Sequence, residues 1–134
     1  MNIRTVKYDY HHLGIPTTEV RKDEIYSPTF KMYTSCGEKS EFRVQFHRFA
    51  ADSPLHPIIK NAPHVAFKVD SIDAAIEGKT VILGPYFPFP GFRVAIIINE
   101  ETNTAIEFVE TDLSEVEIWS PPETASFIYP DAGQ

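Results

Sequence analysis

Short runs of apolar and β-branched residues, separated by turn-forming residues, dominate the sequence. In residues 42–49 the apolar and polar positions alternate, which places Gln45 and His47 on the face opposite Phe46. Alternation of this kind is typical of a β-strand that is buried on one face. The pattern predicts strands at residues 10–15, 29–34, 42–49, 64–69, 80–83, 92–98 and 104–109.

Helical periodicity is scarce. Residues 71–78 (Ser-Ile-Asp-Ala-Ala-Ile-Glu-Gly) predict a short helix with Ser71 as its N-cap and Gly78 at its end. Residues 17–24 are a weaker candidate, capped by Thr17 or Thr18. In both places the predicted helix directly follows a strand.

The order of elements repeats along the chain. His12-Leu-Gly-Ile aligns with His64-Val-Ala-Phe, and each is followed by a helix start, a short strand closing on proline and a hairpin. We therefore expect one domain with two related modules, at about residues 8–49 and 63–110. Residues 50–62 form a linker in which prolines disfavour regular structure, and residues 111–134 form a tail. Trp119, Phe127 and Tyr129 indicate that this tail docks on the protein.

Size and composition narrow the class of protein. The 134 residues, 43% hydrophobic and 23% charged, lie in the globular range and are enough for one hydrophobic core. The net charge of −7, without a basic cluster, disfavours nucleic-acid binding. The single Cys36 cannot form an internal disulfide. Neither a signal peptide nor an apolar run of membrane-spanning length is visible, so we expect a cytoplasmic protein that does not bind membranes.

Four polar residues lie at equivalent points of the repeat. His12 matches His64 near the start of each half, and Gln45 matches Glu107 in each last strand. Individually, each has an ordinary structural explanation, but a carboxylate among apolar neighbours is costly unless something pairs with it. Two imidazoles, a carboxylate and an amide oxygen suit a divalent metal such as Zn, Ni, Co, Fe or Mn, with positions left open for water or substrate.

These motifs also carry a family resemblance. Residues 64–75, the Gly84-Pro85 pair and Ala105-Ile-Glu-Phe108 resemble the second half of glyoxalases and bleomycin-resistance proteins, and His12-Leu-Gly-Ile is similar to their first strand motif. The resemblance to this vicinal-oxygen-chelate superfamily covers residues 8–110. It implies an α+β fold of paired βαβββ modules whose curled sheets surround a shared cavity. It also implies one metal ligand from the first and last strand of each module.

The ligand set resembles that of methylmalonyl-CoA epimerases within the superfamily. This implies a metal-dependent lyase or isomerase that acts on a small molecule with vicinal oxygens through an enolate-like intermediate, with Glu107 as the catalytic carboxylate as well as a ligand. Two alternatives remain open. One is a non-catalytic protein that binds a small molecule or drug, and the other is an extradiol-type dioxygenase using His12, His64 and Glu107.

Further residues have candidate roles. Arg43 and Arg93 are candidates for binding a substrate carboxylate, because arginine binds planar anions through two hydrogen bonds. His47 shares the face of Gln45 and is predicted to lie in the cavity or at its rim, where it is a further candidate for binding substrate. His11 is expected on the opposite strand face from His12, exposed or in contact with a partner. Residues 87–92 are read as a loop over the cavity mouth or an apolar turn, His56 as structural, and the protein as a homodimer.

Overall fold

The computed structural model describes residues 6–36 and 41–114. The docking predicted for the tail aromatics Trp119, Phe127 and Tyr129 therefore lies outside the described residues. Among the described residues, no helix has the length and apolar character needed to cross a membrane. The strands are β1 (Tyr8–Pro16), β2 (Ile25–Ser27), β3 (Met32–Cys36), β4 (Val44–Phe49), β5 (His64–Val69), β6 (Thr80–Phe89), β7 (Phe92–Asn99) and β8 (Thr104–Thr111), and the helices are α1 (Pro57–Asn61) and α2 (Ile72–Ile76).

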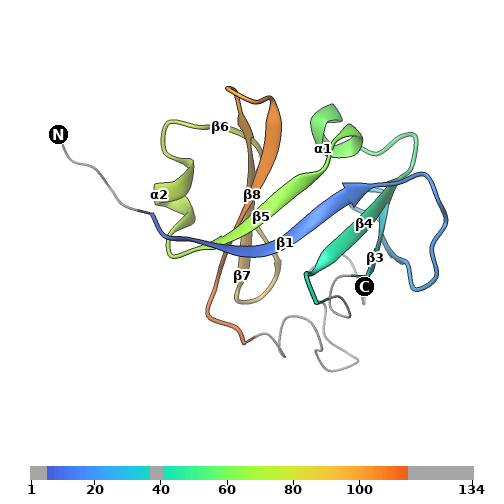
Figure 1. Cartoon of the computed structure of the whole chain (residues 1–134), viewed down its shortest axis with the longest axis horizontal. Helices are drawn as coiled ribbons and strands as arrows, with labels where there is room; N and C mark the ends of the chain where they lie inside the picture. The colour runs from blue at the N-terminus through green and yellow to red at the C-terminus, as the bar shows by residue number, and fades with distance from the viewer. Residues whose placement is uncertain (1–5, 37–40, 115–134) are drawn as a thin grey trace.

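All the strands join in one curled, mixed sheet with the order β2-β3-β4-β1-β5-β8-β7-β6 (Figure 1). In the first half, β1 lies parallel to β4, and in the second, β5 lies parallel to β8. The remaining pairs are antiparallel, including β1–β5, which joins the halves. The strand order of the first half, β2-β3-β4-β1, therefore matches that of the second half, β6-β7-β8-β5. The predicted α+β, glyoxalase-like fold is confirmed, and its curled sheets are continuous with each other.

The second half of the sheet is buried on both faces. On β7, Ala95 and Ile97 belong to a core cluster with Ile72 of α2, whereas the alternate residues Val94 and Ile96 line a cavity on the other face. Figure 1 shows α2 beside β6, β7 and β8. Because α2 covers one face, the concave face remains for a functional site.

The helix predicted at residues 17–24 is wrong, and these residues form a loop. Thr17 Oγ1 accepts a hydrogen bond from the backbone N–H of Glu19, two residues on, but this local turn does not continue into a helix. Side chains then tie the loop to the sheet. The Arg21 guanidinium lies 4.0 Å from the centre of the Phe46 ring, and Glu24 accepts two hydrogen bonds from Arg48. The loop thereby covers the apolar face of β4.

The predicted linker contains a helix, contrary to expectation. Pro57 occupies the start of α1, where a missing backbone N–H costs nothing. His56 caps this helix, since its Nδ1 accepts a hydrogen bond from the backbone N–H of Ile58 at 3.1 Å. His56 is therefore structural, as predicted. Pro57 therefore marks the start of the helix, and the prolines of residues 50–62 do not prevent it.

Candidate metal centre

Three of the predicted ligands converge on one point. The nearest ligand atoms of His12, His64 and Glu107 all lie within 4.8 Å of one another. Their strands β1, β5 and β8 are neighbours in the sheet, so residues far apart in the sequence share its concave face. Glu107 Oε1 lies 3.1 Å from His64 Nε2 and 3.6 Å from His12 Nε2. The two halves of the repeat therefore meet in a single cluster.

Small residues open the space in which this cluster lies. Across β1, β5 and β8, His12 pairs with Ala66, and Ala66 pairs with Glu107. Across β4, β1 and β5, Gln45 pairs with Gly14, and Gly14 pairs with His64. Each half thus supplies a His-x-small motif, and the small residue of each motif lies beside the histidine of the other.

Gly14 is required by this close approach. A Cβ atom on Gly14 would lie 2.3 Å from His64 Cε1 and 2.9 Å from His47 Nε2. Separations below 3.0 Å are essentially never seen for real Cβ atoms, so any larger residue would displace the His64 ring. The glycine of the first motif therefore sets the position of the histidine of the second.

Glu107 is buried and ionised. Burial alone would raise the pKa of its carboxyl group, but the Coulombic attraction of His12 and the hydrogen bonds of both imidazoles outweigh that effect. The pKa of Glu107 is consequently held well below its usual range. A buried carboxylate between two imidazoles has the charge and the donor atoms that a divalent cation needs.

Gln45 lines the same cavity as this cluster. Its side chain is 1% exposed, and its Nε2 has no hydrogen-bond partner among the described residues. A buried amide left without a partner costs about 1–3 kcal/mol, so such groups usually face a ligand, an ion or water. Turning the amide over would present Oε1, a metal-ligating atom, in place of the nitrogen.

His47 also lines the cavity, which is one of the two positions predicted for it, the other being the rim. Its Nδ1 lies 2.9 Å from the Thr34 hydroxyl, and its ring stacks on His64 with ring centres 5.5 Å apart. Its Nε2 is buried and has no partner among the residues that the structure describes. Burial lowers the pKa of His47 to about 3, so the ring is neutral at physiological pH. An oriented, neutral imidazole with one unused nitrogen is suited to contact a substrate.

The prediction for His11 is wrong, because this side chain is 1% exposed. The pairing of β1 with β5 shifts register between Tyr10 and His12, so strict alternation fails at His11. His11 Nδ1 lies 2.8 Å from His12 Nδ1. Burial, followed by the charge of His12, lowers the pKa of His11 to about 3, so this ring is also neutral.

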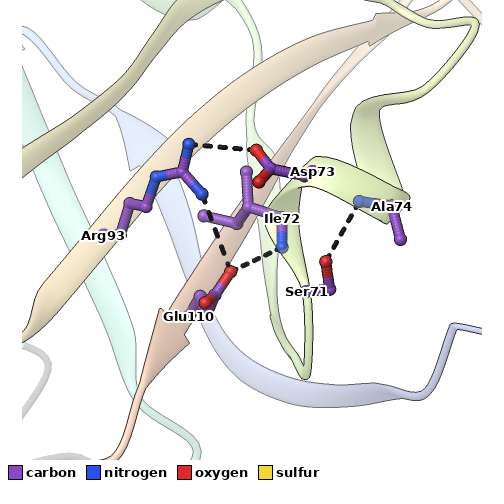
Figure 2. A network of polar contacts seen from close by, with 6 residues as sticks. All are labelled: Ser71, Ile72, Asp73, Ala74, Arg93 and Glu110. Carbon is purple, nitrogen blue, oxygen red and sulfur yellow. Dashed lines mark hydrogen bonds and ion pairs between the residues drawn. The ribbon is translucent and has the colours of Figure 1, made fainter.

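The two arginines proposed for substrate binding do not line this cavity. Arg93 alternates with Phe92 and Val94, which do line it, and therefore faces α2. There it lies 3.1 Å from Asp73 and 3.8 Å from Glu110 (Figure 2). Arg43 has a positive φ of 54° and ends the extended backbone before Val44, so the alternation of β4 does not reach it.

The cavity is small and mostly apolar. It has a volume of about 60 Å³, which is room for a few small groups. From the predicted mouth segment 87–92, Pro88 and Phe92 line it, whereas Phe87 is 62% exposed. Its apolar wall consists of Phe30, Met32, Phe49, Leu55, Ile59, Leu83, Tyr86, Pro88, Phe92, Val94 and Ile96.

Sequence reasoning missed Thr34 and the packing roles of Gly14 and Ala66. The repeat itself carried a signal for the last two, since both follow their histidine by two positions. Thr34 carried none, because its contact with His47 depends on the pairing of β3 with β4.

Fold and site together define a class: a curled, glyoxalase-like sheet with a buried cluster of two histidines and one glutamate. The sequence matches neither a family model nor a curated protein. Among solved structures, the chain is similar to methylmalonyl-CoA epimerase from Mycobacterium tuberculosis, with a TM-score of 0.55 and 15% identity. The similarity covers 78% of this chain and 89% of the other. At that identity the likeness supports the shared fold.

Proposed function

We propose that this protein is a metal-dependent enzyme of the glyoxalase and epimerase type, a lyase or isomerase that moves a proton on a small molecule with adjacent oxygen atoms. The observation that carries the proposal is the meeting of His12, His64 and Glu107, drawn from both halves, in one buried cavity. The chain shares its fold with a methylmalonyl-CoA epimerase, and it offers a cavity on the concave face of its curled sheet.

The metal would be held by His12, His64 and Glu107, with Gln45 as the fourth ligand. Imidazole nitrogens and carboxylate or amide oxygens are suitable for Zn, Ni, Co, Fe or Mn. The buried Nε2 of Gln45, which has no partner among the described residues, supports this assignment, since turning the amide over would put Oε1 in its place as a ligand for the cation. A bound divalent ion supplies Lewis acidity, which polarises a substrate carbonyl and makes the adjacent C–H more acidic.

Side chains of the cavity would transfer the proton and contact the substrate. Glu107 contacts His12 and His64 through Oε1, so Oε2 would be the atom that accepts a proton from carbon. His47 Nε2 is the further polar atom that a substrate oxygen can reach, because Thr34 already binds Nδ1. The apolar wall would lower the local dielectric constant and so strengthen these electrostatic contacts. With about 60 Å³ of space, only a small substrate or the reactive end of a larger one fits.

The test is proton exchange with solvent. The zinc- or cobalt-loaded protein is incubated in D2O with methylmalonyl-CoA or with the hemithioacetal of methylglyoxal and glutathione, and proton NMR follows the C–H beside the carbonyl. The proposal expects catalysed exchange that Glu107→Gln lowers by about 100-fold or more. Glu110→Gln is the matched control, because Glu110 lies on the same strand, does not line the cavity and contacts α2. Absence of exchange with every metal and both compounds would contradict the proposal.

A second function is favoured by the same cluster. Two histidines and one carboxylate with open positions also suit non-haem Fe(II) and oxygen chemistry. Oxygen uptake by the Fe(II)-loaded protein with a catechol, without C–H exchange in the first assay, would identify a dioxygenase. Tight binding of a small molecule with neither reaction would identify a non-catalytic binding protein.

A further inference from the structure

A bulge in β1 brings two consecutive histidines together. In the antiparallel pairing with β5, Tyr10 pairs with Phe67 and His12 pairs with Ala66, so His11 is the extra residue between them. Bulges of this kind redirect side chains and are common beside functional sites. In a regular strand His11 would point away from His12. Here both side chains are buried, at 1% and 3% exposure.

The contact between the two rings is specific. Their Nδ1 atoms are 2.8 Å apart, and the rings meet edge to face with centres 5.1 Å apart. Phe92 also packs against His11, with ring centres 5.8 Å apart, and so limits the rotation of its ring. Two nitrogens at this separation require one of them to carry the hydrogen.

We propose that His11 is a positioning residue that sets the tautomer and orientation of His12. This inference rests on the proposed metal centre. His12 Nε2 is the nitrogen that faces Glu107, and it needs a lone pair to bind a cation. The hydrogen of His12 must then be on Nδ1, which donates it to His11 Nδ1.

The choice of a histidine as acceptor fits this cavity. Metal-binding histidines usually donate their second N–H to a carboxylate, a carbonyl or water. A neutral imidazole can accept this hydrogen bond in place of a carboxylate, and it adds no second negative charge near Glu107. Its flat ring also packs against Phe92, which a carboxylate would do poorly.

Two substitutions separate the hydrogen bond from the packing. His11→Phe keeps a planar ring against Phe92 but removes the acceptor, whereas His11→Asn keeps an acceptor atom in the position of Nδ1. We expect zinc affinity, measured against a competing chelator, to fall about 10- to 100-fold in His11→Phe and to stay close to that of the wild type in His11→Asn. A structural role alone predicts the opposite order, because Asn loses more packing than Phe.

NMR of the wild-type protein labelled with ¹⁵N-histidine and loaded with zinc gives a second readout that needs no variant. The spectra should show the ring proton of His12 on its Nδ1, hydrogen-bonded to His11 Nδ1, and no proton on His12 Nε2. A proton on His12 Nε2, or equal zinc affinity of His11→Phe and the wild type, would overturn the inference while leaving the metal centre intact. A wild-type protein that takes up no zinc would overturn both.

Discussion

Replacing Gly14 with alanine tests how the sheet makes room for the site. The new methyl group would lie 2.3 Å from Cε1 and 2.7 Å from Nε2 of His64, so the imidazole must move by about 1 Å or more to restore ordinary contact. The neighbouring ring of His47 cannot give way freely, because its Nε2 would itself be 2.9 Å from the methyl group. The displacement therefore falls on a predicted metal ligand.

Two magnitudes follow for Gly14→Ala. Overpacking a core of this kind costs about 1–3 kcal/mol, which leaves the protein folded. Outer-shell disturbances already lower metal affinity about 10- to 100-fold, and moving a ligand should cost at least as much, about 1.4–2.8 kcal/mol of binding free energy. Urea denaturation of the metal-free protein measures the first quantity, and zinc titration against a chelator measures the second.

Gly78→Ala is the matched control. A Cβ atom there would meet nothing within 4 Å, but the positive φ of 75° makes the substitution cost about 1–2 kcal/mol. The control should thus lose similar stability and keep its zinc affinity. Wild-type zinc affinity in Gly14→Ala, or an equal loss in both variants, would refute the reasoning from cavity geometry.

Burial lowers the pKa of His47 to about 3, so between about pH 6.5 and 3 the unfolded chain binds a proton that the folded chain does not. As the pH falls from 6.5 to 5, this one group should therefore lower the free energy of unfolding of the metal-free protein by about 2 kcal/mol. In urea denaturation at the two pH values, His47→Gln should lack this contribution to the pH dependence. Glu110 Oε1 accepts a hydrogen bond from the backbone of Ile72 at 2.7 Å and lies near Arg93, so Glu110→Ala should destabilise the protein by about 1–2 kcal/mol at unchanged zinc affinity (Figure 2). Among the strands that the structure describes, β2 and β6 lie at the two edges of the sheet, where further pairing is possible, so we expect a homodimer by light scattering, and a monomer at tens of micromolar would contradict this.

The fold was predictable because the repeat constrained it. The strand at residues 64–69 is found where its run of apolar and β-branched residues placed it, and His12 and His64 lie on equivalent strands of the two halves. Local pattern failed where tertiary contacts decide. At residues 17–24, the cation–π contact of Arg21 with Phe46 ties a loop to the sheet, and its helix-like sequence does not fold as a helix.

The site was predictable only in part. His12, His64 and Glu107 follow from equivalence between the halves, but His11 does not, because a bulge in β1 cannot be read from alternating residues. Arg93 was proposed to bind a substrate carboxylate without knowledge of its register. Its pairing opposite Glu110, three residues beyond Glu107, places it on the other face of the sheet.

Metal content is the most direct test of the central claim. The wild type, His64→Ala, Glu107→Gln and Gln45→Ala are purified without a histidine tag, incubated with zinc, freed of excess metal and analysed by mass spectrometry for ions per chain. We predict about one zinc ion per chain in the wild type and almost none in His64→Ala and Glu107→Gln. Gln45→Ala should lose the least zinc, because water can replace the amide as a ligand. Equal metal content in all four proteins, or none in the wild type, would contradict the account.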